Sequence, residues 1–142
     1  MNDSTLETKV EAYKLIARDS LRMNLISAHL THVGVLEGEI KDSEETKARN
    51  EHEIKVENYE ISKLDVDHPN FDKRKESKEE TVKHLTERSV RFDKEIFDLT
   101  NAVAEQKAAI AKIESGETKV SLENLNCLVE KMVKQDALNQ VK

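Results

Sequence analysis

Residues 82–113 read VKHLTERSVRFDKEIFDLTNAVAEQKAAIAKI and carry apolar side chains at alternating steps of three and four residues. The positions that keep this spacing are Val82, Leu85, Ser89, Phe92, Ile96, Leu99, Val103, Gln106, Ile110 and Ile113. Eight of these ten are apolar, whereas apolar residues make up 37% of the whole chain. An average spacing of about 3.5 residues is typical of a coiled-coil seam. The stretch therefore predicts a long helix that packs along another helix.

The composition of the chain favours helices throughout. Charged residues make up 37% of the 142 residues and aromatic residues only 4%, with three glycines, one proline and no tryptophan. Long helices tolerate this mixture because Glu, Lys, Ala and Leu lose little on entering a helix. A compact β or α/β fold would need more glycine turns and more β-branched or aromatic strands. We therefore expect an all-α fold.

Two break signals divide the chain into three helices. Pro69 disfavours helix at His68, and Ser115 is followed by Gly116, which suits the left-handed position after a helix end. Ser121 has the side chain of an N-cap for the last helix. We predict a single elongated domain over 1–142, with helix 1 at about 4–66, a turn at 67–70, helix 2 at about 71–114, a jog at 115–121 and helix 3 at about 122–139.

The first two helices can pair as a long antiparallel hairpin about the proline turn. If the centre of the turn lies between residues 69 and 70, the numbers of paired residues sum to about 139. The polar seam residue Ser89 then faces Asn50, and Lys47 can lay its aliphatic stem along the ring of Phe92. Buried polar pairs of this kind can fix the register of a coiled coil. A slip by one turn stays open, and helix 3 can lie along the start of helix 1 or fold back over its middle.

The chain carries more apolar surface than one hairpin can bury. Apolar residues surround much of the predicted helix between residues 6 and 36, and Val90, Phe97, Ala104 and Ala111 repeat every seven residues on an outward position. Contiguous exposed apolar surface usually marks an interface. A three-helix monomer would bury it internally, but we favour a homo-oligomer or a place in a larger bundle. The residues that we predict to bind a protein partner are Tyr13, Ile16, Met23, Val90, Phe97, Leu125 and Met132.

The net charge of −6 is concentrated in one segment. Residues 37–67 hold eleven acidic and five basic residues, a difference of six that accounts for the whole net charge. A solvated helix face is the simplest interpretation. The alternative is an acidic face that meets a basic partner, formed by Glu44, Glu45, Glu51 and Glu53. The remainder of the chain is balanced, so we expect no direct binding to nucleic acid.

No motif in the sequence predicts catalysis or a cofactor. There is no phosphate-binding loop, no His-Glu-x-x-His and no Cys-x-x-Cys, and we expect neither a small-molecule substrate nor a metal. His29 and His32 lie one turn apart, but such histidines are more commonly solvated or at interfaces than metal-bound. Cys127, the only cysteine, is expected to act as a small buried hydrophobic residue. We therefore predict that the protein is not an enzyme.

The remaining expectations concern location and mode of action. Residues 1–8 lack the charge and the apolar run of a signal peptide, and 25–36 is too short and too polar to span a membrane. This predicts an intracellular (cytoplasmic) or virion protein. We expect a structural, scaffolding or adaptor subunit that acts through coiled-coil and bundle contacts, with a viral particle or its assembly machinery as one setting. The alternative is an acidic binding protein that inhibits or masks a basic partner, such as a nucleic-acid enzyme.

Overall fold

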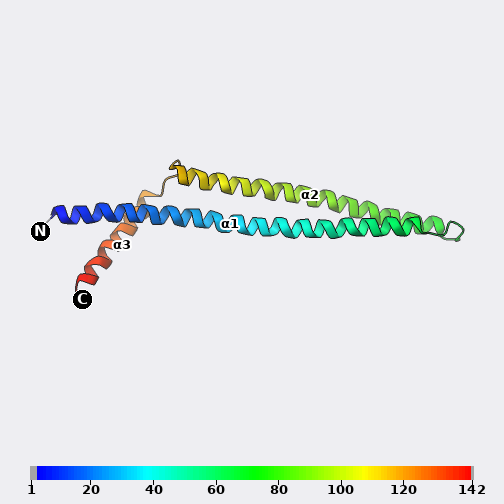
Figure 1. Ribbon diagram of the computed structural model, residues 1–142, viewed down its shortest axis with the longest axis horizontal. Helices are drawn as coiled ribbons and strands as arrows, with labels where there is room; N and C mark the ends of the chain where they lie inside the picture. The colour runs from blue at the N-terminus through cyan, green and yellow to red at the C-terminus, as the bar shows by residue number, and fades with distance from the viewer. Residues whose placement is uncertain (1–2, 142) are drawn as a thin grey trace. The chain divides into compact units, whose positions relative to one another are not determined.

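Three helices make up almost all of the protein in the computed structural model, which describes residues 3–141 (Figure 1). They are α1 (Asp3–Ser62), α2 (Phe71–Ser115) and α3 (Leu122–Val141). Within these residues there is no strand. The prediction of an all-α fold with a helical hairpin and a shorter C-terminal helix is confirmed.

The end of α1 is the boundary that differs most from the prediction, at Ser62 rather than near residue 66. Local side-chain hydrogen bonds take over at this point. The Ser62 hydroxyl donates to the carbonyl of Tyr59 at 2.5 Å, and the amide of Asp67 donates to the Asp65 carboxylate at 3.0 Å. Bonds of this kind offer the backbone an alternative to the helix. The turn therefore begins before the segment that Pro69 restricts.

The carboxyl end of α2 and the amino end of α3, on either side of the loop of residues 116–121, lie close to their predicted positions. Gly116 adopts the left-handed conformation, with φ at 86°, and the amide of Thr118 donates to the carbonyl of Lys112 at 3.0 Å. These features close the carboxyl end of α2. The Ser121 hydroxyl accepts a hydrogen bond from the amide of Asn124 at 3.3 Å. Ser121 is therefore the N-cap of α3, as predicted.

The chain divides into two units. Unit 1 combines α1 up to Val33 with α2 from Glu105, the following loop and α3. Unit 2 runs from Gly34 to Ala104 and so contains the rest of α1, the turn and the rest of α2.

Unit 2 is an antiparallel hairpin whose seam contains a buried polar contact. Asn50 is 5% exposed, and its Nδ2 donates to the Leu85 carbonyl at 2.6 Å and to the Ser89 hydroxyl at 2.7 Å. The predicted pairing of Ser89 with Asn50 is confirmed. Lys47, beside this contact, places Nζ 2.5 Å from the carboxylate of Asp93. The hydrogen bond to that carboxylate raises the pKa of Lys47.

Unit 1 is held by contacts of α1 with α3 and with the end of α2. Ala17, Leu125 and Val129 are buried together between α1 and α3. Partly buried residues surround them, namely Val10, Tyr13, Leu21, Leu128, Met132 and Val133. Lys9 lies 3.7 Å from Asp136, so α3 runs antiparallel to the first part of α1. Of the two positions that the sequence left open for the last helix, the structure therefore shows the one along the start of α1.

Cys127 is exposed, so the expectation that it would be buried is wrong. The packing face of α3 carries Leu125, Leu128, Val129 and Met132, which recur at steps of three, one and three residues. Successive residues of a helix are rotated by about 100°. Cys127 consequently lies outside this face.

Candidate interaction surfaces

Three of the seven residues predicted to bind a partner lie in the contact between α1 and α3. Leu125 is buried there, and Tyr13 and Met132 are partly buried against it. The Tyr13 hydroxyl also hydrogen-bonds to the Asp136 carboxylate, and this bond raises the pKa of Tyr13 above its ordinary value. These three side chains therefore pack against one another's helices within unit 1.

Ile16 and Met23 instead lie on an open line of α1, which also includes Leu30. We call these three residues the α1 stripe. They are 57%, 58% and 55% exposed, although each carries a large apolar side chain. Seven residues are almost two full helical turns, so the three side chains follow one another along the same line. The sequence indicated apolar excess here, but only the structure shows which residues α3 leaves uncovered.

The two sides of α1 that flank the stripe are already in use within unit 1. On one side, Arg22 donates to the carbonyls of Ile113 and Glu114 at 3.4 and 3.2 Å, and His29 Nδ1 lies 2.6 Å from Gln106 Oε1. These contacts bring the end of α2 against α1. On the other side, Ala17 packs against α3. The stripe is therefore an open face of this segment between its contacts with α2 and α3, and Leu15 and Leu25, outside the stripe, are exposed as well.

Val90 and Phe97 form a second exposed apolar pair, on α2 in unit 2. Phe97 is 65% exposed and Val90 63%. The sequence pattern placed both residues outside the seam, and the structure agrees with that placement. Phe97 is the largest of the exposed side chains in unit 2 that carry no polar atom.

The four residues of the predicted acidic face, Glu44, Glu45, Glu51 and Glu53, are all exposed on α1 in unit 2. Glu51 lies 3.6 Å from Lys47 within the same helix. The other three make no ion pair with any residue that the structure describes. Their charges therefore point into solvent and are available to a basic partner.

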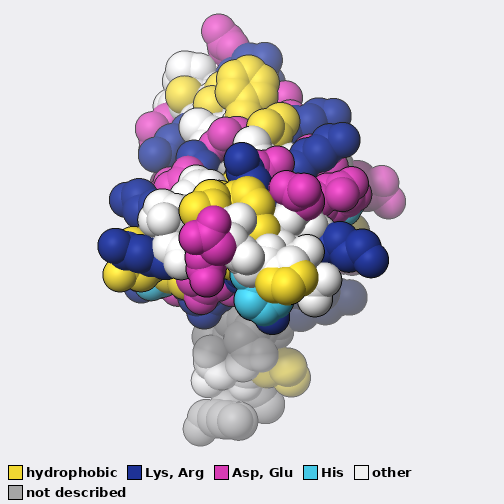
Figure 2. Space-filling view, turned by 90° about the vertical axis from the view of Figure 1, so that its right-hand side faces the viewer, with side chains coloured by type: hydrophobic (Ala, Val, Ile, Leu, Met, Phe, Trp, Pro, Cys, Tyr) yellow, Lys and Arg dark blue, Asp and Glu magenta, His cyan; other side chains and the backbone are white. Residues whose placement is uncertain are grey.

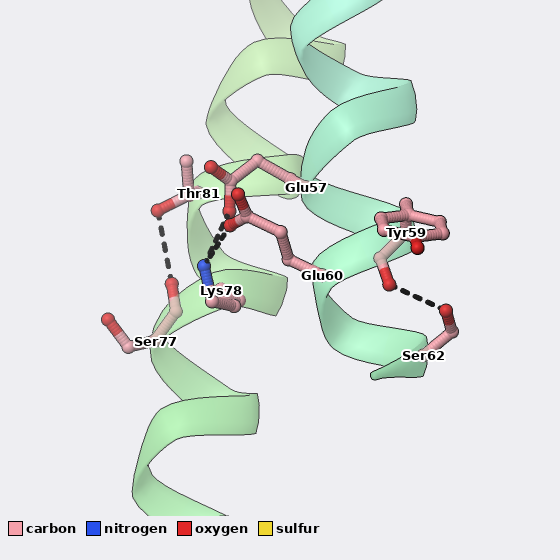
Figure 3. Close-up of polar contacts among 7 residues, drawn as sticks. All are labelled: Glu57, Tyr59, Glu60, Ser62, Ser77, Lys78 and Thr81. Atoms are coloured by element: carbon pink, nitrogen blue, oxygen red, sulfur yellow. Dashed lines mark hydrogen bonds and ion pairs between the residues drawn. The ribbon is translucent and has the colours of Figure 1, made fainter. Parts of the chain in front are cut away.

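Four basic residues follow the turn, namely Lys73, Arg74, Lys75 and Lys78, and carboxylates of α1 pair with the last of them. The ammonium group of Lys78 lies 2.5 Å from the Glu60 carboxylate and 3.4 Å from that of Glu57, so α1 and α2 are linked close to the turn (Figure 3). The hydrogen bond to Glu60 raises the pKa of Lys78. Lys73 and Arg74 line a shallow depression next to this cluster.

A further hollow lies in unit 1, beside the loop of residues 116–121. It has a volume of about 470 Å³ and is lined by Arg18, Arg22, Gly116, Thr118, Lys119, Val120, Leu122 and Leu125. Its walls come from α1, the loop and α3, so no local pattern in the sequence indicates it. Arg22 is already engaged with the end of α2.

The described residues contain neither a metal-binding group nor a membrane-spanning helix. Between residues 3 and 141 there is no set of three or more His, Cys, Asp or Glu side chains placed to hold a metal ion. No described helix combines the length and the apolar character needed to cross a bilayer. Basic and acidic side chains alternate over the face shown in Figure 2, with apolar side chains between them.

No protein-family model, curated protein or solved structure matches the chain.

Proposed function

We propose that the protein is a non-enzymatic structural, scaffolding or adaptor subunit that acts through helix–helix contacts. The observation that supports this most directly is the α1 stripe, where Ile16, Met23 and Leu30 are each more than half exposed. Burying one such side chain completely contributes about 1.5–3 kcal/mol. Leaving three of them in line on one helix is costly unless another surface covers them.

The arrangement of the helices fits this role. Within unit 2, a helix that rises about 1.5 Å per residue places the side chains on the outer side of the hairpin at fixed intervals. In unit 2, the buried Asn50–Ser89 hydrogen bond sets the register of that hairpin. Phe97 then occupies a defined place on its outer side. The proposal covers a subunit of a cytoplasmic assembly and a component of a virus particle alike.

The test is recovery of the tagged full-length chain from its native cells, with the wild type compared with Met23→Asp and Phe97→Asp. We expect the wild type to carry a partner or a second copy in fixed stoichiometry at high salt, and the stripe variant to lose it. Leu138→Asp, a change at an exposed apolar position on α3, is the control for solubility and yield. Recovery of the wild type as an isolated monomer under gentle conditions would refute the proposal.

A second function is favoured by the exposed carboxylates of Glu44, Glu45 and Glu53, which point into solvent. In this proposal, the acidic face binds a basic protein and masks or inhibits it. Interactions between exposed charges are screened over a length of about 8 Å at physiological ionic strength. The screening length is roughly threefold shorter at 1 M salt than at 0.1 M. We therefore expect an electrostatic partner to dissociate when salt is raised from about 0.1 to about 0.5 M. Such loss, together with loss on charge reversal at Glu44 and Glu45, would favour masking over the scaffold.

A further inference from the structure

We infer that the α1 stripe is a two-fold interface at which α1 pairs with α1 of a second copy of this chain. The inference depends on the proposed function, because it names the partner of that same surface. It rests on the order of large and small residues along the exposed face, and on the area that the face offers.

Large and small side chains alternate along the stripe. Ile16, Ser20, Met23, Ser27 and Leu30 follow one another at steps of four, three, four and three residues. This spacing keeps all five on one helical face, and all five are exposed. A helix face with this pattern can receive the large residues of a partner over its own small residues, as knobs enter holes in a coiled coil.

The order of the residues is complementary to itself when two copies run antiparallel. With the two-fold axis at the level of residue 25, the numbers of facing residues sum to 50. Met23 of each copy then faces Ser27 of the other, and Leu30 faces Ser20. In a two-fold interface the same patch serves both copies, so each pair occurs twice. Met23 and Leu30 are thereby each placed over a small side chain.

The area of the face is consistent with pairing of modest affinity. At about 25 cal/mol per Å², the roughly 1.5–3 kcal/mol of a fully buried large side chain corresponds to about 60–120 Å², so each stripe residue offers roughly 30–60 Å² when about half exposed. The three together supply about a sixth of the roughly 800 Å² per partner that a stable interface buries, which corresponds to weak pairing. The stripe and the small residues between them carry no charge. A second copy, which is apolar and small in the same places, therefore fits this face better than a highly charged partner.

The first experiment measures the mass of the purified full chain by light scattering coupled to size exclusion, from micromolar to millimolar concentration. We expect a concentration-dependent rise from 16.3 kDa to twice that mass. Met23→Asp should raise the dissociation constant at least tenfold, while Leu138→Asp, an exposed apolar position on α3, should leave it unchanged. Circular dichroism of each variant shows that the helices are retained. A wild-type monomer at every concentration would overturn the inference.

The substitution Ser27→Leu distinguishes specific packing of two copies from non-specific hydrophobic association. The substitution adds apolar surface, so non-specific association would become stronger. If Met23 of the second copy packs over Ser27, the added side chain instead fills the space and weakens the dimer by tenfold or more. Stronger association of this variant would refute the inference.

The direction of pairing is tested by disulfide formation between chains carrying Met23→Cys and chains carrying Ser27→Cys, both with Cys127→Ser. An antiparallel pair joins the two kinds of chain in preference to two identical ones. A predominance of bonds between two Met23→Cys chains would indicate parallel pairing and refute the two-fold arrangement. If the purified chain is a monomer but a Met23-dependent complex exists in cells, only the identity of the partner is refuted. If neither exists, the proposed function fails as well.

Discussion

Replacement of Asn50 by alanine tests whether the buried polar contact in unit 2 stabilises the hairpin. The substitution removes two hydrogen bonds, to the Leu85 carbonyl at 2.6 Å and to the Ser89 hydroxyl at 2.7 Å. Each such bond contributes about 1 kcal/mol net, and alanine recovers roughly 0.5 kcal/mol through its higher helix propensity. We therefore expect the free energy of unfolding to fall by about 1.5 kcal/mol.

The assay for Asn50→Ala is urea unfolding followed by circular dichroism, at one fixed protein concentration because self-association would change the apparent stability. Glu53→Ala, an exposed change one turn further along α1, should stay within about 0.5 kcal/mol of the wild type. A double-mutant cycle with Ser89→Ala should give a coupling energy of about 1 kcal/mol. Unchanged or increased stability of Asn50→Ala would refute the reasoning, and so would a coupling energy near zero.

Three further predictions concern the seam, the loop and the contact between α1 and α3. Val103→Asp places a charge at a position that is 9% exposed and should lower the free energy of unfolding by about 3–4 kcal/mol, so an unchanged urea midpoint would contradict its place in the seam. Gly116→Ala forces a side chain onto a backbone with φ at 86° and should lower the free energy of unfolding by about 1 kcal/mol. Gly38→Ala should raise it by a similar amount, because no atom lies within 4 Å of the added Cβ and alanine favours the helix. Thermal unfolding compares the two variants, and a change of stability in the same direction for both would refute the left-handed conformation of Gly116. The pKa of Tyr13 should lie above 10.0 and fall on Asp136→Ala, as measured by ultraviolet titration with the other tyrosine replaced by phenylalanine; no change would exclude the hydrogen bond. Because the folded-state pKa is raised, the stabilisation from this bond is present at neutral pH and is lost as the pH rises through that value.

The elements and the register of the hairpin could be predicted from the sequence because their signals are local or periodic. The spacing of residues 82–113 indicated a seam, and the match of Ser89 with Asn50 selected a register that the hydrogen bond confirms. Gly116 and Ser121 marked helix ends through their own backbone and side-chain chemistry. Each of these features depends on residue spacing or on neighbours close in sequence, both of which can be read directly from the chain.

The parts that could not be predicted depend on packing between segments distant in sequence. The position of α3 is set by the cluster of Ala17, Leu125 and Val129, and the same helix face could have packed elsewhere on α1. The exposure of Cys127 follows from that choice of face. The early end of α1 depends on hydrogen bonds made by the side chains of Asp65 and Ser62. These bonds compete with continuation of the helix beyond Ser62.

The short loop of residues 116–121 has a consequence for how firmly α3 must bind to α1. A short flexible connection holds a tethered segment at an effective concentration in the millimolar range. An intrinsic dissociation constant of about 0.1 mM would then keep α3 docked for most of the time. A competing helix from outside, present at micromolar concentration, would have to bind the Ala17 face roughly a thousandfold more tightly than α3 to displace it. The loop thus keeps weakly binding helices off the Ala17 face, even if the contact between α1 and α3 is small.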